Sequence, residues 1–426
     1  MRLLKGSLVR NTGWMLLGQL AAYALKIVYF IAIARLLGVV QYGLVVGAYA
    51  LINLVAHYCR LGMGTVLLRY VSPNHDRFAA YWGNLLLVTT AMGAIVLPIL
   101  RLLAPNILDR ASAEIVVATA VSCCLFEQIT MSATQAFQAF QRMPIAAVLS
   151  QLTPLLRAIA AIGMLLTVHH ANARQWTVAL MVSSAVAAVI AFTTVTIRLG
   201  WPQLKPYLIP SQCREGAWYA FSASTESAYN DIDKTMLSHY GMSAANGIYG
   251  IAYRIIDMGC VPIASIQQAA DPRLFQLAAD GPREPIRLGK RLLKHGVAVA
   301  AISAVAMFLC APLVPSLAGR QFAAAVSALR WLCLIPILRS VHGITGNVLT
   351  SLGLQRYRTS TQVAAAVLNL GLNAWLIPRF GWHGAAWASL LTDGTLGLSN
   401  WCVLAVVGKN LMGEIAGADY ACMYGK

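Results

Sequence analysis

Long apolar stretches separated by short polar connections dominate the chain. A helix that crosses a bilayer needs about 20 residues, and twelve stretches reach that length. They cover approximately residues 12–34, 40–62, 83–105, 114–140, 144–168, 176–198, 215–240, 244–270, 293–317, 321–352, 360–378 and 382–408. The pattern predicts an all-α membrane protein with about twelve transmembrane helices. The seventh and eighth stretches are the weakest, because both contain ionisable residues.

Composition supports this prediction. Of the 426 residues, 58% are hydrophobic and only 11% are charged, whereas soluble domains carry about 25% charged residues. The connections are too short to form a separate soluble domain. The first apolar stretch has no small-residue cleavage site, so we expect an uncleaved first helix and not a signal peptide. A cytosolic enzyme, a β-barrel and a disulfide-rich scaffold are all disfavoured.

The cysteines and histidines give no sign of a metal site. Most of the nine cysteines lie inside apolar stretches, no CxxC motif occurs, and the eight histidines are scattered. Buried cysteine commonly acts as a small apolar packing residue. We therefore expect neither a metal nor any other cofactor.

The net charge of +17 is explained by topology. The N-terminal, even-numbered and C-terminal connections hold twenty Lys and Arg residues, and the alternate connections hold five. Positive residues concentrate in cytoplasmic loops, so we expect both termini to be cytoplasmic. This asymmetry accounts for most of the charge without nucleic acid as a partner.

The chain also repeats itself at about half its length. Gln141 and Arg142 follow the fourth stretch, and the same pair follows the tenth, 214 residues later. Gly38 and Gly43 mark the junction between the first two stretches, much as Gly241 and Gly247 mark the seventh junction. Parallel repeats are typical of transporters with a substrate path between two halves. We expect six-helix lobes at 1–198 and 215–408, a cytoplasmic linker at 199–214 and a cytoplasmic tail at 409–426.

Basic residues inside the apolar stretches are candidates for substrate binding, because a charge at membrane depth is costly and usually faces a cavity or a partner. Lys26 shares a polar face of the first helix with Gln19 and Tyr23, and the seventh helix has a polar stripe that includes Asn230. Two such faces suggest a water-filled cleft between the lobes. The proposed cationic cleft contains Lys26 and Arg157 first, then Arg254 and Lys234, then one of Arg330 and Arg339, with Arg339 as the candidate, and the polar Gln19, Tyr23 and Asn230.

Buried carboxylates are candidates for ion coupling. Glu127, Asp233 and Asp393 lie in apolar surroundings that favour the protonated form. The competing interpretation is static pairing with a cation such as Lys26, Arg157 or Arg254. Two carboxylates, Asp231 and Asp257, also stand three residues from Lys234 and Arg254, and both spacings permit local ion pairs.

No motif of an enzyme is present. The chain has no phosphate-binding glycine loop of an ATPase. Its outer connections are about ten residues or fewer and hold few acidic residues, whereas a membrane glycosyltransferase needs outer loops that hold the sugar. We expect a protein that is not an enzyme.

Several segments resemble a known family of membrane proteins. Residues 230–237 (NDIDKTML), followed by Gly241 and residues 247–249 (GIY), resemble the seventh-helix pattern of polysaccharide and O-antigen flippases. Residues 351–356 (SLGLQR), 369–378 (NLGLNAWLIP) and 381–386 (GWHGAA) resemble the family's eleventh and twelfth helices, and residues 34–38 (ARLLG), 42–43 and 62–65 (GMGT) also match. Over nearly its whole length the chain is similar to the Wzx-type branch of the multidrug/oligosaccharidyl-lipid/polysaccharide exporter superfamily.

This resemblance implies two six-helix lobes that work by alternating access in the bacterial inner membrane. It implies a polyprenyl-diphosphate-linked oligosaccharide as substrate, used for lipopolysaccharide, capsule or exopolysaccharide, with a polymerase and glycosyltransferases as possible partners. Three rivals remain open. A drug or toxin exporter of the same superfamily is disfavoured by the intramembrane Lys and Arg, a lipid-II-type flippase by the lack of extra helices, and a membrane glycosyltransferase or polymerase by the short outer loops.

Overall fold

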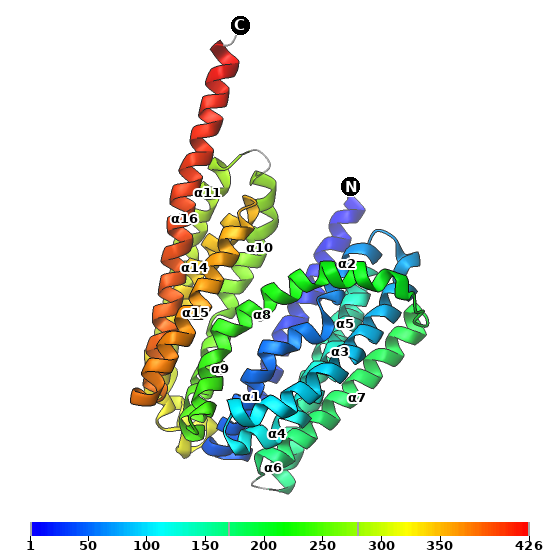
Figure 1. Ribbon diagram of the computed structural model, residues 1–426, viewed down its shortest axis with the longest axis vertical. Coiled ribbons are helices and arrows are strands. Elements are labelled where there is room, and N and C mark those ends of the chain that lie inside the picture. Colours follow the sequence, from blue (N-terminus) through cyan, green and yellow to red (C-terminus); the bar gives the residue numbers. More distant parts are fainter. Residues whose placement is uncertain (1, 169–170, 279–280, 425–426) are drawn as a thin grey trace. The chain divides into compact units, whose positions relative to one another are not determined.

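The computed structural model describes the backbone of residues 2–168, 171–278 and 281–424, and the side chains of 25–168, 171–271, 273–278 and 281–406. Within these ranges the chain forms sixteen α-helices and no β-strand (Figure 1). The all-α prediction is therefore confirmed. Packing divides the chain into two compact units: unit 1 is Met1–Gly247 with Leu317–Gln321, and unit 2 is Ile248–Ser316 with Phe322–Lys426.

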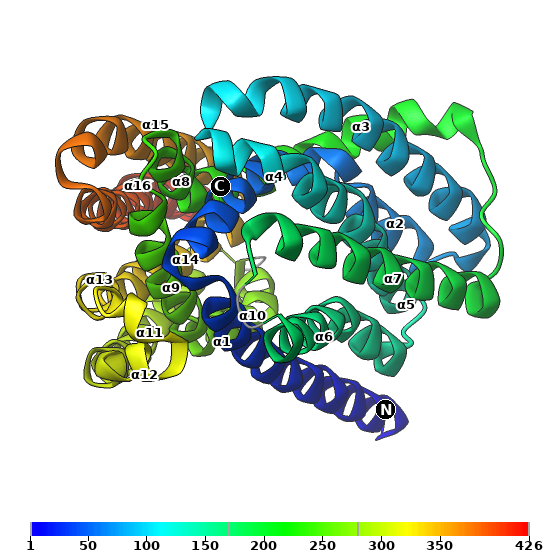
Figure 2. The same cartoon turned by 90° about the horizontal axis from the view of Figure 1, so that it is seen from below.

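Unit 1 is built from the first eight helices and the start of the ninth. They are α1 (Arg2–Arg60), α2 (Met63–Val71), α3 (Phe78–Ile107), α4 (Arg110–Ala120), α5 (Glu127–Ala139), α6 (Met143–Thr167), α7 (Ala173–Leu199), α8 (Ile209–His239) and α9 (Ser243–Gly259). In Figure 2 the helices α3, α4, α7 and α6 lie side by side, and each neighbouring pair is in contact.

A kink divides α1 into two helices. Gly38 has φ 67° and ψ 178°, a conformation that glycine adopts without the steric penalty of a Cβ atom. The kink lies between the first two apolar stretches of the sequence. It is held by Arg35, whose Nε donates to the carbonyl of Leu317 at 2.6 Å, and by Gln321, whose Oε1 accepts from the backbone of Val39 at 3.3 Å.

The core of unit 1 is apolar and tightly packed. Trp82, Leu85, Leu67 and Phe137 are fully buried where α2, α3 and α5 meet. Many apolar side chains on the outer faces of the same unit are exposed, including Leu102, Val148, Leu166 and Ile197. Large exposed apolar surfaces are rare on soluble monomers, so these outer faces fit contact with lipid.

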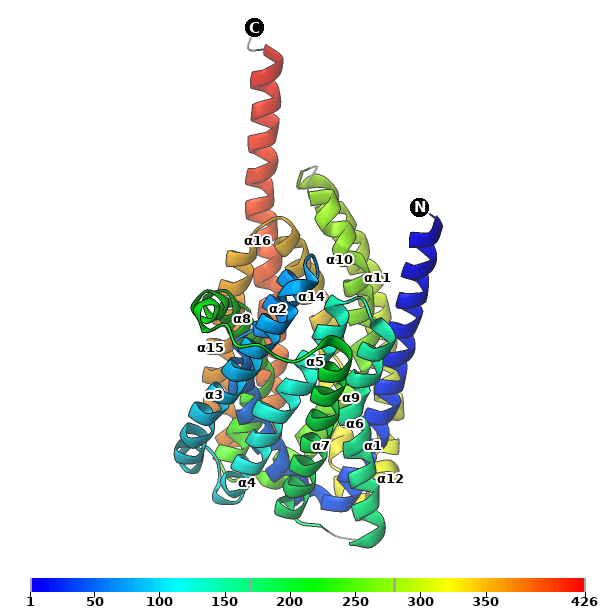
Figure 3. The same cartoon turned by 90° about the vertical axis from the view of Figure 1, so that its right-hand side faces the viewer.

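Unit 2 contains the rest of α9 and seven further helices. They are α10 (Val261–Ala278), α11 (Arg283–Cys310), α12 (Val314–Ala318), α13 (Ala325–Leu332), α14 (Ile335–Ser351), α15 (Gln355–Phe380) and α16 (Trp382–Tyr424). The helices α11, α14, α15 and α16 pack in sequence, and α16 continues past the ends of α14 and α15 (Figure 3).

Eight described segments have the length and apolarity of membrane spans: 25–71, 75–107, 110–139, 143–167, 173–199, 283–318, 325–351 and 355–380. The first of them includes parts of the first two predicted helices, which α1 joins. The weak seventh and eighth stretches and the twelfth stretch are not among these eight segments. The eighth is divided between α9 and α10, and the tenth between α13 and α14.

The compact units do not coincide with the lobes expected from the sequence repeat. Unit 1 extends through α8, because α8 packs extensively against α1. The linker at 199–214, expected between the two lobes, was inferred from the sequence repeat and not from packing. The two lobes therefore stay a prediction.

Candidate functional site

The first polar cluster of unit 1 surrounds Arg157 on α6, and we call it the Arg157 cluster; it also contains Ser122, Glu127 and Ser184. The Arg157 residue is only 9% exposed. Its Nη2 lies 3.3 Å from Glu127 Oε2 and donates to the hydroxyls of Ser184 at 3.0 Å and Ser122 at 3.2 Å. The carboxylate and the two hydroxyls compensate this guanidinium for part of its loss of water, although its Nε is buried without a hydrogen-bond partner.

A wide helical turn places two members of this cluster. Residues Val121–Phe126 between α4 and α5 form a π-helical turn, a feature often found at functional sites. The Ser122 residue lies within it and Glu127 follows it as the first residue of α5. Glu127 is in contact with Arg157, which is the arrangement that static pairing predicts.

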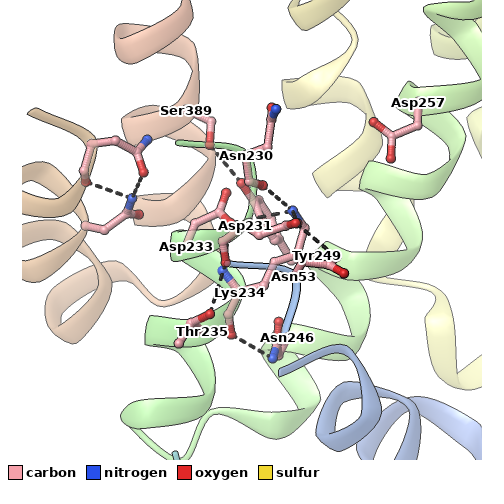
Figure 4. Close-up of polar contacts among 12 residues, drawn as sticks. Asn53, Asn230, Asp231, Asp233, Lys234, Thr235, Asn246, Tyr249, Asp257 and Ser389 are labelled. Atoms are coloured by element: carbon pink, nitrogen blue, oxygen red, sulfur yellow. Dashed lines mark hydrogen bonds and ion pairs between the residues drawn. The ribbon is translucent and has the colours of Figure 1, made fainter. Parts of the chain in front are cut away.

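The second polar cluster of unit 1, the Lys234 cluster, consists of Asn53, Asn230, Asp231, Asp233 and Lys234 (Figure 4). Lys234 Nζ lies 2.8 Å from Asp231 Oδ1 and 3.6 Å from Asp233 Oδ1, and it also donates to the carbonyl of Asn230. Asp233 is fully buried. Asn53 donates to the second oxygen of Asp231 at 3.2 Å. One ammonium therefore lies beside two carboxylates, and the pair expected from the i, i+3 spacing of Asp231 and Lys234 is confirmed.

Neighbouring contacts fix the Lys234 cluster between α1 and α8. The amide of Asn246 donates to the backbone carbonyls of Lys234, at 3.0 Å, and Gly43, at 3.2 Å. The ring of His57 forms a 3.0 Å hydrogen bond with the hydroxyl of Ser227. These bonds satisfy polar groups on helices that are otherwise apolar, as membrane interiors require.

Unit 2 contains a third cluster, the Arg339 cluster, formed by Tyr253, Asp257, Arg339, His342 and Asp393. Arg339 Nη1 lies 3.0 Å from Asp257 Oδ1, and its Nε lies 3.9 Å from Asp393 Oδ2. The other oxygen of Asp393 is 3.7 Å from His342 Nε2. The guanidinium also lies 5.7 Å from the centre of the Tyr253 ring. The carboxylates of α9 and α16 therefore meet a cation of α14.

Two further polar contacts in unit 2 join helices. Asn373 on α15 donates to Asn369 Oδ1 at 2.8 Å, and Asn369 donates to Thr392 on α16 at 3.0 Å. Tyr249 on α9 and Ser389 on α16 share a 2.9 Å hydrogen bond (Figure 4). Asn369 and Asn373, four residues apart on α15, therefore contribute to helix packing.

The other predicted site residues have different surroundings. Lys26 on α1 and Arg254 on α9 are exposed. Asn230 donates its side chain to the carbonyl of Glu226 at 3.0 Å. The side chains of Gln19 and Tyr23 lie outside the described residues.

The structure also distinguishes the two tenth-helix arginines. Arg339 enters the interior of unit 2 with a side chain only 19% exposed. Arg330 is exposed and lies 5.0 Å from the centre of the Phe308 ring. The break between α13 and α14 separates the two residues.

Sequence reasoning missed several members of these clusters. The sequence gives no sign that Ser122 and Ser184 belong to the Arg157 cluster, because a serine in an apolar helix usually forms a hydrogen bond with the backbone of its own helix. His342 stands three residues after Arg339, a spacing that could have indicated a shared face. Asp257 was paired with Arg254 along its own helix, whereas the structure gives it Arg339 of α14 as a partner.

The described residues contain no group of three or more His, Cys, Asp or Glu that could hold a metal ion. The three clusters instead combine buried cations with carboxylates and hydroxyls. Such groups bind and exchange anions or protons.

Comparisons with known proteins place this geometry in context. The family model described as "Polysaccharide biosynthesis protein" matches residues 8–278. Comparison with curated proteins gives no match. The fold is similar to lipid II flippase MurJ in an inward closed conformation, with TM-score 0.76, 10% identity and coverage of 92% of this chain and 87% of that one.

Two transporters of the MOP superfamily have a similar fold. One is an inward-facing multidrug resistance MATE family transporter, with TM-score 0.72, 14% identity and coverage of 91% of this chain and 95% of that one. The other comes from Pyrococcus furiosus and has TM-score 0.66, 13% identity and coverage of 95% and 96%. At these identities the likeness shows the fold alone.

Proposed function

The chain belongs to the polysaccharide biosynthesis protein family, and from this premise we propose that it is a flippase for a lipid-linked oligosaccharide. Its fold is that of the MOP-superfamily flippases and transporters. The substrate is a polyprenyl-diphosphate-linked repeat unit of O-antigen, capsule or exopolysaccharide. The protein moves it from the cytoplasmic to the periplasmic leaflet of the bacterial inner membrane by alternating access, and it catalyses no covalent step.

The observation that carries this proposal is the presence of cations inside both units. Arg157 and Lys234 lie in unit 1 and Arg339 lies in unit 2, each with little exposed surface. A diphosphate carries two or more negative charges, and moving it through a medium of low dielectric constant requires compensating charge. Arginine also binds phosphate with two parallel hydrogen bonds. Lys26 on α1 adds a further cation with an exposed side chain.

Carboxylates beside these cations suggest how binding is coupled to protons. Glu127 forms an ion pair with Arg157, and Asp393 forms one with Arg339. A proton taken up by either carboxyl would weaken its ion pair and make the guanidinium available to a phosphate. Deprotonation would restore the pair and release the anion. Asp233 stands in the same relation to Lys234.

The orientation follows from the distribution of positive charge. We propose twelve spans in two six-helix lobes, 1–198 and 215–408, with the linker at 199–214, the tail at 409–426 and both termini on the cytoplasmic side. Glycosyltransferases and a polymerase of the same polysaccharide are the natural partners, because the former assemble the repeat unit before transfer and the latter uses it afterwards.

A deletion strain tests the proposed function. If the protein is a flippase, deletion leads to accumulation of polyprenyl-diphosphate-linked repeat units at the cytoplasmic face of the inner membrane, and the finished polysaccharide disappears. A drug or toxin exporter would instead leave the polysaccharide intact and increase sensitivity to its substrate. Normal levels of lipid-linked intermediate together with normal polysaccharide would contradict the proposal.

A further inference from the structure

Residues 200–221 form an aromatic strap that joins α7 to the first turns of α8. Three of its aromatic residues are highly exposed, namely Trp201 at 75%, Tyr207 at 75% and Trp218 at 74%. Figure 3 shows the linker passing from the end of α7 to the start of α8, and in Figure 1 the first part of α8 runs across the end of unit 1 beside α2. The exposed aromatic rings therefore lie on a segment that crosses one end of the helix bundle.

The inner face of the strap is firmly attached to unit 1. A Cβ atom on Gly216 would lie 2.0 Å from the carbonyl oxygen of Leu61, so α8 and the end of α1 are in direct backbone contact. The Asn84 side chain donates to the carbonyl of Lys205 and accepts from its backbone N–H, both at 3.0 Å. The backbone of Gln203 also donates to the carbonyl of Ala79 at 2.9 Å. The strap is fixed in position without using its aromatic residues.

The two faces of the strap helix differ in character. Gln212, Gly216 and Ala220 recur every four residues and are buried. Arg214, Trp218 and Phe221 lie on the opposite side and are exposed. A helix with one packed face and one face of arginine and aromatic rings is typical of a helix that lies in a membrane interface.

The charge around the strap is strongly positive. Basic residues exposed at this end of unit 1 are Arg77, Arg142, Arg198, Lys205 and Arg214. The strap's own acidic residue is Glu215. It forms an ion pair with Arg69 at 2.7 Å and accepts a hydrogen bond from the hydroxyl of Tyr70 at 3.0 Å. Asp76 is exposed nearby. The surface around the aromatic rings thus carries a net positive charge and is complementary to anions.

We propose that the aromatic strap binds the headgroups of anionic phospholipids in the cytoplasmic leaflet. Tryptophan and tyrosine rings settle at the headgroup level, and Lys205 and Arg214 attract negatively charged lipid. Because the strap connects the two halves of the sequence repeat and is attached to unit 1, bound lipid holds the start of α8 at the membrane surface.

Quenching of tryptophan fluorescence tests the proposal. The full chain is reconstituted into vesicles that contain either brominated phosphatidylglycerol or brominated phosphatidylcholine at the same mole fraction. Quenching should be greater with phosphatidylglycerol. Replacing Trp201 and Trp218 by Phe should remove the difference, although eight of the ten tryptophans remain.

Charge variants identify the cause of the preference. Lys205→Gln with Arg214→Gln should lower the preference for phosphatidylglycerol roughly twenty-five-fold, since each basic residue near the surface contributes about fivefold. Arg214→Gln alone should lower it about fivefold and keeps Lys205 as a topology signal. Arg110→Gln is the matched control, because its side chain is 97% exposed and lies in a connection expected on the opposite side.

Two results would overturn the proposal. One is equal quenching of the unaltered protein by both lipids. The aromatic rings would then contact lipid without a preference for negative charge, or would bind a protein partner. The other is a preference for phosphatidylglycerol that survives both charge variants. An effect of Arg110→Gln as large as that of Arg214→Gln would also contradict it, because general surface charge would then be the cause.

Discussion

At the scale of single residues, Arg157, Lys234 and Arg339 are held by neighbours that the sequence only partly reveals. The spacing of Asp231 and Lys234 predicted their ion pair, because residues three apart share a helix face. The same spacing also permitted a pair of Asp257 with Arg254, but Asp257 contacts Arg339 of another helix. Spacing along one helix gives no information about partners on a second helix, so the interhelical contacts of Glu127 and Asp393 required the structure.

The Arg157–Glu127 ion pair should be important for stability. Glu127→Ala is expected to lower the free energy of unfolding by roughly 3 kcal/mol, because it leaves a buried guanidinium without its carboxylate. Replacing both residues by Leu should restore much of the loss, since apolar residues often substitute well for a buried pair. Thermal unfolding of the purified variants in detergent checks this. Additive losses in the double variant would contradict the pairing.

Lys26 should be needed for transport and not for folding. Its side chain is exposed on α1, so Lys26→Ala should leave the amount of protein in the membrane unchanged while polysaccharide export is lost. Lys26→Arg should retain part of the activity, because the positive charge remains. Quantifying surface polysaccharide in a complemented deletion strain measures both effects. Normal export by the alanine variant would remove Lys26 from the proposed cleft.

At the scale of secondary-structure elements, glycine allows helices of unit 1 to approach at backbone distance. A Cβ on Gly247 of α9 would lie 2.0 Å from the carbonyl oxygen of Val39, and a Cβ on Gly43 would lie 1.8 Å from that of Ser243. Close approach through small residues is a common form of helix packing in membranes. The kink of α1 and the start of α9 are therefore locked together.

Gly247→Ala should disrupt this contact. The added methyl group meets backbone atoms that cannot rotate away, so we expect a loss of roughly 2–3 kcal/mol in the free energy of unfolding. Gly163→Ala is the control, because a Cβ there has no neighbour within 4 Å; it should stabilise α6 by up to about 1 kcal/mol. Thermal unfolding of both variants compares them. Equal melting temperatures would show that α1 and α9 separate easily.

The elements themselves were largely predictable from hydropathy, and their interruptions were not. The strongly apolar stretches became helices at nearly the expected positions, because length and apolarity are sufficient to specify a membrane helix. Hydropathy did not indicate the π-helical turn at 121–126, the break between α13 and α14 or the break at Cys260. These depend on local backbone hydrogen bonding, which neutral apolar sequence does not encode.

The repeat is also supported at this scale. Gly38 and Gly241, which were matched by sequence, have φ values of 67° and 68°. Both positive φ values are conformations that glycine adopts without the steric penalty of a Cβ atom. The fourth and tenth stretches also end alike: the N–H of Arg142 donates to the carbonyl of Phe137, and that of Leu354 to the carbonyl of Leu349, each at 2.9 Å.

At the scale of the whole molecule, the charge distribution determines the proposed orientation. Reporter fusions at Arg174 and Arg379 should be periplasmic, and fusions at Lys205, Lys290 and Lys426 should be cytoplasmic. The physical reason is that positively charged connections are retained on the cytoplasmic side. Paired reporters that are active on opposite sides of the membrane measure this. A cytoplasmic result at Arg174 would exclude the arrangement of twelve spans.

The central claim is that this protein moves a polyprenyl-diphosphate-linked oligosaccharide across a bilayer. The most direct measurement uses the purified protein in sealed vesicles that contain the labelled lipid-linked oligosaccharide, with a membrane-impermeant reagent reporting the sugar in the outer leaflet. The account predicts that the protected fraction becomes accessible with the unaltered protein and stays protected with Lys26→Ala or in protein-free vesicles. Protection that is the same with and without the unaltered protein would contradict it.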